Sequence, residues 1–382
     1  MNDQKNILSR FSLSLKGLAR RNRKRALLLN NLGEGSLDFS SNDYLGLSHH
    51  PKLLASVKLA IEDGMAVGAT GSRLLRGHHI QHHNLETQAA EIFGSEHALY
   101  FANGFMANYA LFTCLPKAGD LIIYDELVHA SIHDGMLAGK AKTIAAKHND
   151  VGHFEEIIKQ QRGAGFIGQI WISIESIYSM DGDIAPVAEL VSIANKYDAF
   201  LVVDEAHATG VWGEGGKGLI AQYEGAENII SMHTCGKALG ASGALICASK
   251  VICDYMVNFS RPFIYSTAPS PLAAYTVSQS LEIMQDEGVI LRERLLKHIK
   301  LTQSLFASLG LETSNTQIQP IIIGDAGKTM EIAGMLQSQG YDIRGVRPPT
   351  VPDGSSRLRI TINLNISEQN IRAMATILKA VL

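Results

Sequence analysis

Lys237 lies in a segment of the sequence that has no other Lys, Arg, Asp or Glu. The run SMHTCGKALGASGA surrounds it with small and apolar residues, three of which are glycines. A lysine that is withdrawn from water loses its proton more readily, and the neutral amine is then a nucleophile and a base. The structural alternative is a side chain whose stem packs while its amine reaches the surface. The segment alone favours neither interpretation.

Asp204 ends an apolar run, AFLVV, that is typical of a buried strand. An unpaired carboxylate there is costly, so a cationic partner would account for it; the alternative is that Asp204 only caps a helix. His207 follows in DEAHATGVWG, and Asp181 and Asp183 follow another strand-like run. Because ligands of parallel sheets bind at the carboxyl ends of strands, these residues and Lys237 are candidates for one site.

Pyridoxal phosphate is a cofactor that needs these residue types together. It requires a lysine for a Schiff base, a carboxylate for its pyridinium nitrogen and a cradle for its phosphate. Gly104 and Phe105, in ANGFMANYA, predict a helix start whose backbone N–H groups face an anion, although such a start is more often only a turn. Thr234, shortly before Lys237, would add a hydroxyl donor.

Short apolar runs alternate with helical stretches in the first two thirds of the chain. Strands are predicted at 97–102, 120–125, 141–146, 169–176, 199–206, 229–234 and 243–249, with helices at 84–94, 103–115 and 187–198. Apolar strands that alternate with helices are typical of a parallel sheet covered by helices on both faces. Such a sheet would bring the polar strand ends to one edge.

The sequence after residue 284 predicts a smaller α/β domain. A long helix is predicted at 288–310, strands at 318–324, 342–346 and 357–362, and helices at 329–340 and after Ser367, a favourable N-cap. We therefore divide the chain into an N-terminal segment, 1–44, a large cofactor-binding domain, 45–284, and a small C-terminal domain, 285–382.

Composition narrows the class of protein. The 382 residues are 46% hydrophobic and 19% charged with a net charge of −3, which favours a globular protein and argues against nucleic acid or a membrane as partner. No apolar run reaches the length of a membrane helix, and the four cysteines lack disulfide or metal spacing, so we expect a cytoplasmic protein. One basic run, ARRNRKR at 19–25, is interpreted as the solvated face of a helix.

The run GHHIQHH spaces His78 from His82, and His79 from His83, as a metal site on a helix would. No carboxylate or cysteine nearby completes a ligand set, so these histidines are interpreted as solvated loop side chains and no metal is expected.

Longer motifs make the sequence resemble the α-oxoamine synthases, pyridoxal-phosphate enzymes of the fold type I aminotransferase superfamily. The resemblance extends from FSSNDYLGLSHHP to RPPTVPDGSSRLRIT, nearly the whole chain. SMDGDIAP and DEAHATGVWGE are widely shared in that family, whereas RPFIYSTAPSP and RPPTVP favour its alanine-using member. The resemblance implies a fold type I transferase, with a mostly parallel sheet in the large domain and a smaller α/β C-terminal domain.

The resemblance also implies roles for residues around pyridoxal 5'-phosphate. Lys237 matches the lysine that holds the cofactor, Asp204 the carboxylate on the pyridinium nitrogen, and His129 the histidine stacked over the ring. His207 and Ser179 match groups near the phenolic oxygen. Lys237, His129 and Asp204 are therefore the expected catalytic residues.

Phosphate contacts are implied at two places in the sequence. Gly104, Phe105 and Thr234 match contacts from the same chain. Ser266 and Thr267, in IYST, match residues that reach the phosphate of the neighbouring subunit. The resemblance therefore implies a homodimer with shared active sites.

Substrate contacts are implied near both ends of the chain. Asn42 and Arg359 match contacts to the substrate carboxylate, and Thr350 matches a product contact. His129 also faces substrate, and Arg23 is chosen from the basic run as the N-terminal arginine that touches it.

The reaction that the resemblance implies is a decarboxylative condensation of L-alanine with a pimeloyl thioester, carried by coenzyme A or an acyl carrier protein. The alternative is a member that condenses glycine with acetyl-CoA or succinyl-CoA. A regulator that merely carries the cofactor is an alternative of another class, but 382 residues leave no room for the extra DNA-binding domain that it would need.

Overall fold

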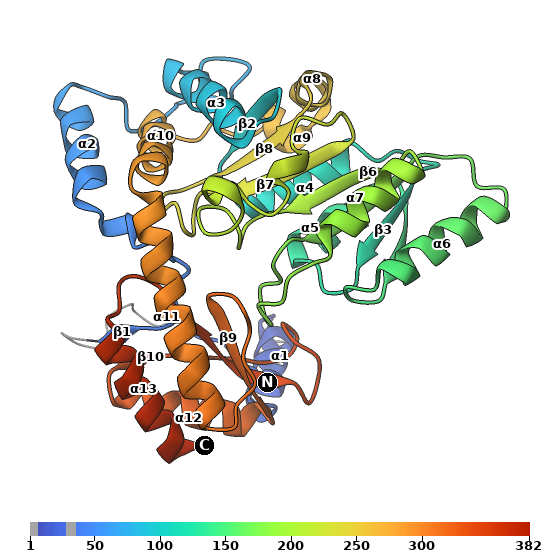
Figure 1. Cartoon of the computed structure of the whole chain (residues 1–382). Coiled ribbons are helices and arrows are strands. Elements are labelled where there is room, and N and C mark those ends of the chain that lie inside the picture. The colour runs from blue at the N-terminus through green and yellow to red at the C-terminus, as the bar shows by residue number, and fades with distance from the viewer. Residues whose placement is uncertain (1–6, 28–35) are drawn as a thin grey trace, which may run out of the picture. The chain divides into compact units, whose positions relative to one another are not determined.

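The computed structural model describes residues 7–27 and 36–382, which form two compact units (Figure 1). The large unit contains Asn42–Ser179 and Asp183–Leu296. The small unit contains Lys297–Leu382, the described residues up to Ser41, and Met180–Gly182. The division after residue 296 lies within helix α11 (Gly288–Ser308), whereas the sequence placed a boundary at residue 284.

A seven-stranded sheet forms the centre of the large unit, in the order β2-β8-β7-β6-β5-β3-β4. Its strands are β2 (His97–Phe101), β3 (Leu121–Asp125), β4 (Lys142–Ala146), β5 (Ile170–Glu175), β6 (Phe200–Asp204), β7 (Ile229–Thr234) and β8 (Ala244–Ala248). Neighbours from β4 to β7 are parallel, and β8 is antiparallel to β7 and β2. The predicted mostly parallel sheet is confirmed.

Helices cover both faces of this sheet because its strands are apolar on both sides. Successive residues of a strand point to opposite faces of the sheet. On one face, residues such as Ile122 and Val202 pack with helices α4 (Gly104–Cys114) and α5 (Ala130–Ala138). On the other face, residues such as Ile123 and Val203 pack with α6 (Val151–Gly163) and α7 (Val187–Lys196). Helices α3 (Ile80–Phe93) and α10 (Pro271–Asp286) pack beside β2 and β8. The large unit also contains helices α2 (Pro51–Glu62), α8 (Lys250–Phe259) and α9 (Arg261–Ile264).

The small unit has its own sheets and helices. Strands β9 (Ile318–Gly324), β11 (Arg344–Val346) and β12 (Ser356–Thr361) form an antiparallel sheet in the order β11-β12-β9, and β1 (Leu37–Asp38) pairs with β10 (Tyr341–Asp342). Its helices are α1 (Ser9–Arg20), α12 (Ala326–Ser338), α13 (Glu368–Val381) and most of α11. The strand predicted at 342–346 is therefore two strands in different sheets. Ser367 caps α13 as predicted.

The interpretation of the four histidines as loop residues is wrong for His82. Helix α3 begins at Ile80, and His82 is completely buried in its first turn. Its Nδ1 accepts from the backbone N–H of His79 at 3.0 Å, and its Nε2 donates to the carbonyl of Pro269 at 2.8 Å. Both ring nitrogens therefore serve the fold. In the described part of the chain no three potential ligands gather for a metal, and no helix is long and apolar enough to cross a membrane.

Candidate active site

Lys237 belongs to the loop that joins the antiparallel strands β7 and β8. The loop closes through a hydrogen bond from Cys235 N–H to the Gly243 carbonyl, 2.9 Å, and one from Gly240 N–H to the Lys237 carbonyl, 2.8 Å. Gly240 has a φ of 59°, and a Cβ there would collide with the backbone of Ser48. The small residues around Lys237 are thus needed because this loop packs tightly against another segment.

The amine of Lys237 contacts a histidine. Its Nζ lies 2.8 Å from Nε2 of His207, and the Tyr44 hydroxyl lies 2.6 Å from Nδ1 of the same ring. The Tyr44 hydroxyl donates to Oδ1 of Asn42 at 3.1 Å. Its oxygen therefore accepts from Nδ1–H of His207, which leaves Nε2 as the acceptor for Lys237. Lys237, His207 and Asn42, all predicted from the sequence, lie in one hydrogen-bonded chain that includes Tyr44.

Asp204 ends strand β6 and is only 4% exposed. Its Oδ1 accepts from the backbone N–H of Ala206 at 2.9 Å, and its Oδ2 accepts from Nδ2 of Asn108 at 2.7 Å. The residues that follow form turns and not a helix, so the helix-cap alternative is wrong. These donors stabilise a buried carboxylate, which is the form that can hold a proton on a pyridinium nitrogen.

His129 precedes helix α5 and caps it. The backbone N–H of Ser131 donates to Nδ1 of His129 at 3.2 Å, and the Ser131 hydroxyl lies 2.7 Å from the same nitrogen. Partial withdrawal of the ring from water lowers the pKa of His129, and the charge of Lys237 lowers it further, whereas Asp204 opposes this. The ring is therefore predominantly neutral at neutral pH.

The start of helix α4 offers backbone donors to an anion. Asn103 is its N-cap: its side chain accepts from Met106 N–H at 2.8 Å, and its carbonyl accepts from Ala107 N–H at 3.1 Å. The N–H groups of Gly104 and Phe105 belong to this first turn and have no acceptor within the helix. The Thr234 hydroxyl lies 3.5 Å from the place that a Cβ on Gly104 would occupy. These donors fit a phosphate group.

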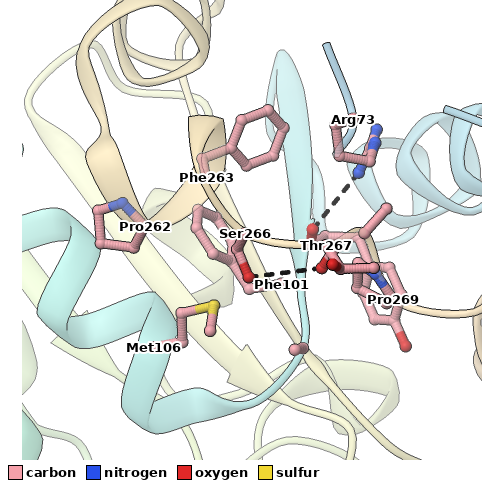
Figure 2. A pocket seen from close by; sticks show the side chains of 11 residues that line it. Arg73, Phe101, Met106, Pro262, Phe263, Ser266, Thr267 and Pro269 are labelled. Atoms are coloured by element: carbon pink, nitrogen blue, oxygen red, sulfur yellow. Dashed lines mark hydrogen bonds between the residues drawn. The ribbon is translucent and has the colours of Figure 1, made fainter. Parts of the chain in front are cut away.

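Ser266 and Thr267 lie in the segment after α9, beside a small pocket lined by Phe101, Met106 and Phe263 (Figure 2). Thr267 pairs with Ser72 in an isolated bridge, and Thr267 is exposed whereas Ser266 is half-buried.

Arg73 anchors the loop beside this pocket. Its guanidinium is buried and forms an ion pair with Glu86 at 2.8 Å. It also donates to the carbonyl of Tyr100 at 3.4 Å, the bond drawn as a dashed line from Arg73 in Figure 2. Because Glu86 also accepts from the backbone N–H of Tyr100, the loop is fixed to strand β2.

Three predicted substrate residues belong to the small unit. Arg359 is 9% exposed in β12 and donates to Oγ1 of Thr361 at 2.9 Å. Thr350 accepts from Nη2 of Arg25 at 2.9 Å, whereas Arg23 forms an ion pair with Asp353. The structure therefore brings Arg25, and not Arg23, to Thr350. Sequence reasoning had no means to choose among the arginines of one basic run.

Asp181 and Asp183 each pair with a basic side chain. Asp181 forms an ion pair with Arg357, within the small unit. Asp183 accepts from Nε2 of His148 at 2.6 Å, and Asp125 accepts from its Nδ1 at 2.9 Å. Although partial burial opposes protonation, the two carboxylates raise the pKa of His148 to about 10. Ser179 follows strand β5 in the large unit and is half-buried.

Sequence reasoning missed four residues of this region: Tyr44, Asn108, Ser131 and Glu175. Asn108 and Ser131 connect Asp204 with His129, at 2.7, 3.0 and 2.7 Å along the chain of side chains. Glu175 pairs in register with Asp204 and is 2% exposed. Burial, and then the charge of Asp204, raise its pKa well above the ordinary range. For Asn108 and Glu175 the available signal was a polar residue in a largely apolar helix or strand.

Fold and site together define a fold type I enzyme that uses pyridoxal phosphate. The chain belongs to the aminotransferase class I and II family, whose model matches residues 34–378. Its relatives include the 8-amino-7-oxononanoate synthases of Citrifermentans bemidjiense, 40% identical over 91% of this chain and 90% of the relative, and of Geobacter sulfurreducens, 38% identical over 88% and 86%. The resemblance to this group of acyltransferases, and with it the cofactor pyridoxal 5'-phosphate, is confirmed.

Solved structures agree with this fold. The 8-amino-7-oxononanoate synthase from Francisella tularensis superposes with a TM-score of 0.77 at 26% identity, covering 91% of this chain and 98% of that one. The Sphingomonas wittichii serine palmitoyltransferase superposes with a TM-score of 0.89 at 25% identity, covering 100% and 98%. The fold type I architecture is therefore confirmed.

Proposed function

We propose that this protein condenses L-alanine with a pimeloyl thioester to give 8-amino-7-oxononanoate, CO2 and the free thiol, a step of biotin biosynthesis. The observation that carries the proposal is the contact of Lys237 with His207, in a chain 40% identical to a synthase of that name. RPFIYSTAPSP and RPPTVP support the alanine-using reaction.

The residues of the large unit divide the work of holding the cofactor. Lys237 would bind it covalently, Asp204 would keep its pyridinium nitrogen protonated, and His129 would cover its ring. Gly104, Phe105 and Thr234 would bind its phosphate, and His207 and Ser179 would bind its phenolic oxygen. Pyridoxal phosphate, when bound, accepts the electron pair left on the α-carbon of the amino acid.

Lys237 also moves a proton. As a free amine it would be the base that removes the proton from the α-carbon of the amino acid. His207, 2.8 Å from the amine, orients it and accepts one of its hydrogens, while Tyr44 fixes the tautomer of the imidazole.

Substrate carboxylates are bound by arginines. Arg359 and Asn42 bind the carboxylate of alanine, because a guanidinium can form two parallel hydrogen bonds to it. Thr350 contacts the product. Arg25 is a second candidate beside Arg23 for the N-terminal substrate contact, since it is the arginine that donates to Thr350.

The active protein is a homodimer in which Ser266 and Thr267 complete the phosphate site of the partner subunit. Large apolar side chains near this segment support an interface: Leu75 is 87% exposed and Tyr265 is 71% exposed. Exposed apolar groups of this size favour a protein partner. The exposed Thr267 is available to such a partner.

The experiment pairs each amino acid with each acyl donor and measures thiol release and product mass. The donors are pimeloyl-CoA, pimeloyl-acyl carrier protein, acetyl-CoA and succinyl-CoA. We expect L-alanine with a pimeloyl donor to be fastest. Because alanine and glycine differ by one methyl group, worth roughly 1–3 kcal/mol in a fitted pocket, glycine should react more slowly but measurably.

Faster turnover of glycine with a short acyl donor would contradict this proposal. The protein would then be a 2-amino-3-ketobutyrate CoA ligase if acetyl-CoA were preferred, or a 5-aminolevulinate synthase if succinyl-CoA were preferred. The comparison of the two pimeloyl donors identifies the acyl carrier.

A further inference from the structure

A buried chain of side chains joins Asp204 to His129 inside the large unit. Nδ2 of Asn108 donates to Oδ2 of Asp204 at 2.7 Å and to Oγ of Ser131 at 3.0 Å. Oγ of Ser131 lies 2.7 Å from Nδ1 of His129. Asn108 is 1% exposed and Ser131 is completely buried, so water does not compete for these bonds. The chain links a strand end to the residue before a helix.

The donors in this chain run in one direction. Asn108 has two amide hydrogens, and the carboxylate of Asp204 and the oxygen of Ser131 accept one each. Since the Ser131 oxygen accepts from Asn108, its single hydrogen is available to Nδ1 of His129. The backbone N–H of Ser131 points to the same nitrogen at 3.2 Å. Nδ1 of His129 is therefore an acceptor, and the ring proton is on Nε2.

The packing of helices α4 and α5 fixes this geometry. Gly135 of α5 lies so close to α4 that a Cβ there would meet Cβ of Phe112 at 3.0 Å, Cα of Tyr109 at 3.2 Å and the carbonyl oxygen of Asn108 at 3.3 Å. The close approach sets the distance between Asn108 on one helix and Ser131 on the other. A looser crossing would separate the amide from the hydroxyl.

We infer that Asn108 and Ser131 are positioning residues that hold His129 as the Nε2–H tautomer and tie its orientation to the ionised carboxylate of Asp204. The reason that this orientation matters rests on the proposed function, in which His129 covers the ring that Asp204 keeps protonated. The tautomer itself is a property of the protein without substrate. A change at Asp204 or at His129 would then be transmitted to the other residue through the neutral side chains of Asn108 and Ser131.

Other groups also act on the His129 ring, and a titration must account for them. They are Asp204 on β6, Lys237 in the loop after β7, and His133 and Asp134 on α5. Glu175 on β5 accepts from the backbone of His129. Substitutions at Asn108 and Ser131 leave all of these charges in place. A change in the titration of His129 in such variants is then assigned to the hydrogen-bond chain.

The test is nitrogen NMR of the full chain with 15N-labelled histidine, without and with cofactor, and with His129→Asn to assign the signal. The unsubstituted protein should show the Nε2–H tautomer and a pKa below the ordinary value of about 6.5. Ser131→Ala and Asn108→Ala should raise that pKa towards the ordinary value and increase the share of the Nδ1–H tautomer, although the backbone N–H of Ser131 still favours the Nε2–H form. Ser131→Thr, which keeps a hydroxyl, should restore the original signal. Ser192→Ala, an exposed serine on α7 that bonds its own helix, is the matched control.

Turnover separates a positioning role from a purely structural one. Ser131→Ala should lower kcat roughly tenfold with little change in KM, and Ser131→Thr should recover it. An unchanged His129 signal in both alanine variants, with the fold intact by circular dichroism, would overturn the inference. So would a changed signal with unaltered kcat. If the NMR changes occur but no alanine-dependent turnover is found in the unsubstituted protein, the proposed function fails while the hydrogen-bond chain stands.

Discussion

Lys237 Nζ lies 2.8 Å from Nε2 of His207, so the loop after β7 and the segment after β6 meet through these two side chains. The imidazole is itself fixed by Tyr44, which is completely buried. His207 therefore positions the amine that the proposed function requires to bond with a carbonyl group.

Lys237→Ala should abolish turnover and remove the covalent link to the cofactor, although the phosphate donors of α4 remain. Borohydride reduction followed by peptide mapping should label Lys237 in the unsubstituted protein. Lys250→Ala, an exposed lysine on α8, is the control and should leave labelling and turnover unchanged. A label on any other lysine would show that the assignment is wrong.

Asp204→Asn should lower kcat by orders of magnitude while circular dichroism stays unchanged. An amide cannot keep the pyridinium nitrogen protonated. The new side chain would also have only one oxygen left to accept from Nδ2 of Asn108. Steady-state kinetics with L-alanine and pimeloyl-CoA measure the effect. Near-normal activity would mean that the carboxylate has only a structural role.

Mixed dimers of a Lys237→Ala chain and a Thr267→Val chain test whether the site is shared. If Thr267 serves the partner's cofactor, one of the two sites in such a dimer combines an intact Lys237 with an intact Thr267. Activity should then rise on mixing above that of either variant alone. No rise, with heterodimer formation verified by differential tagging, would place Thr267 at the site of its own chain.

Glu175→Gln should stabilise the protein near neutral pH. The pKa of Glu175 is raised in the folded state, chiefly by burial, so its contribution to stability is full below the unfolded pKa and is lost as pH rises through the folded pKa. The amide keeps the shape of the neutral acid and removes this loss. Urea unfolding between pH 5 and 8, roughly the stable range of most proteins, should show a smaller decline for the variant. Parallel curves would mean that Glu175 is ionised in the folded protein.

His148→Gln should flatten the stability curve at alkaline pH. The folded pKa of His148 is about 10 because Asp125 and Asp183 both bind its ring, so its contribution is full below about 6.5 and is lost as pH rises from there to about 10. The unsubstituted protein should therefore lose more stability across that window than the variant. His97→Gln, at an exposed position, is the control. Equal losses in both variants would contradict the ion-pair interpretation.

The strands and most helices could be predicted because apolar runs of the right length alternate with amphipathic ones. The same pattern located Asp204, since an acid at the end of an apolar run is conspicuous. It could not reveal Asn108 or Ser131, because their partners come from different elements and depend on how closely α4 approaches α5.

His82 shows why a local pattern failed at the histidines. Its partner, the Pro269 carbonyl, lies 187 residues away in sequence, so nothing near the run GHHIQHH indicates burial. The contact of Arg25 with Thr350 could not be predicted for a similar reason, since the two residues lie 325 positions apart in sequence.

Strand β1 cannot pair until late in the synthesis of the chain. Leu37 and Asp38 pair with Tyr341 and Asp342, and the Phe39 carbonyl accepts from Thr361 N–H at 2.7 Å. During synthesis, residues 37–39 therefore have no strand to pair with until more than three hundred further residues have left the ribosome. Residues 42–296, which contain the whole seven-stranded sheet, emerge in the meantime. A nascent chain released after residue 296 but before residue 341 would therefore contain every strand of the seven-stranded sheet but leave β1 without its partner strand.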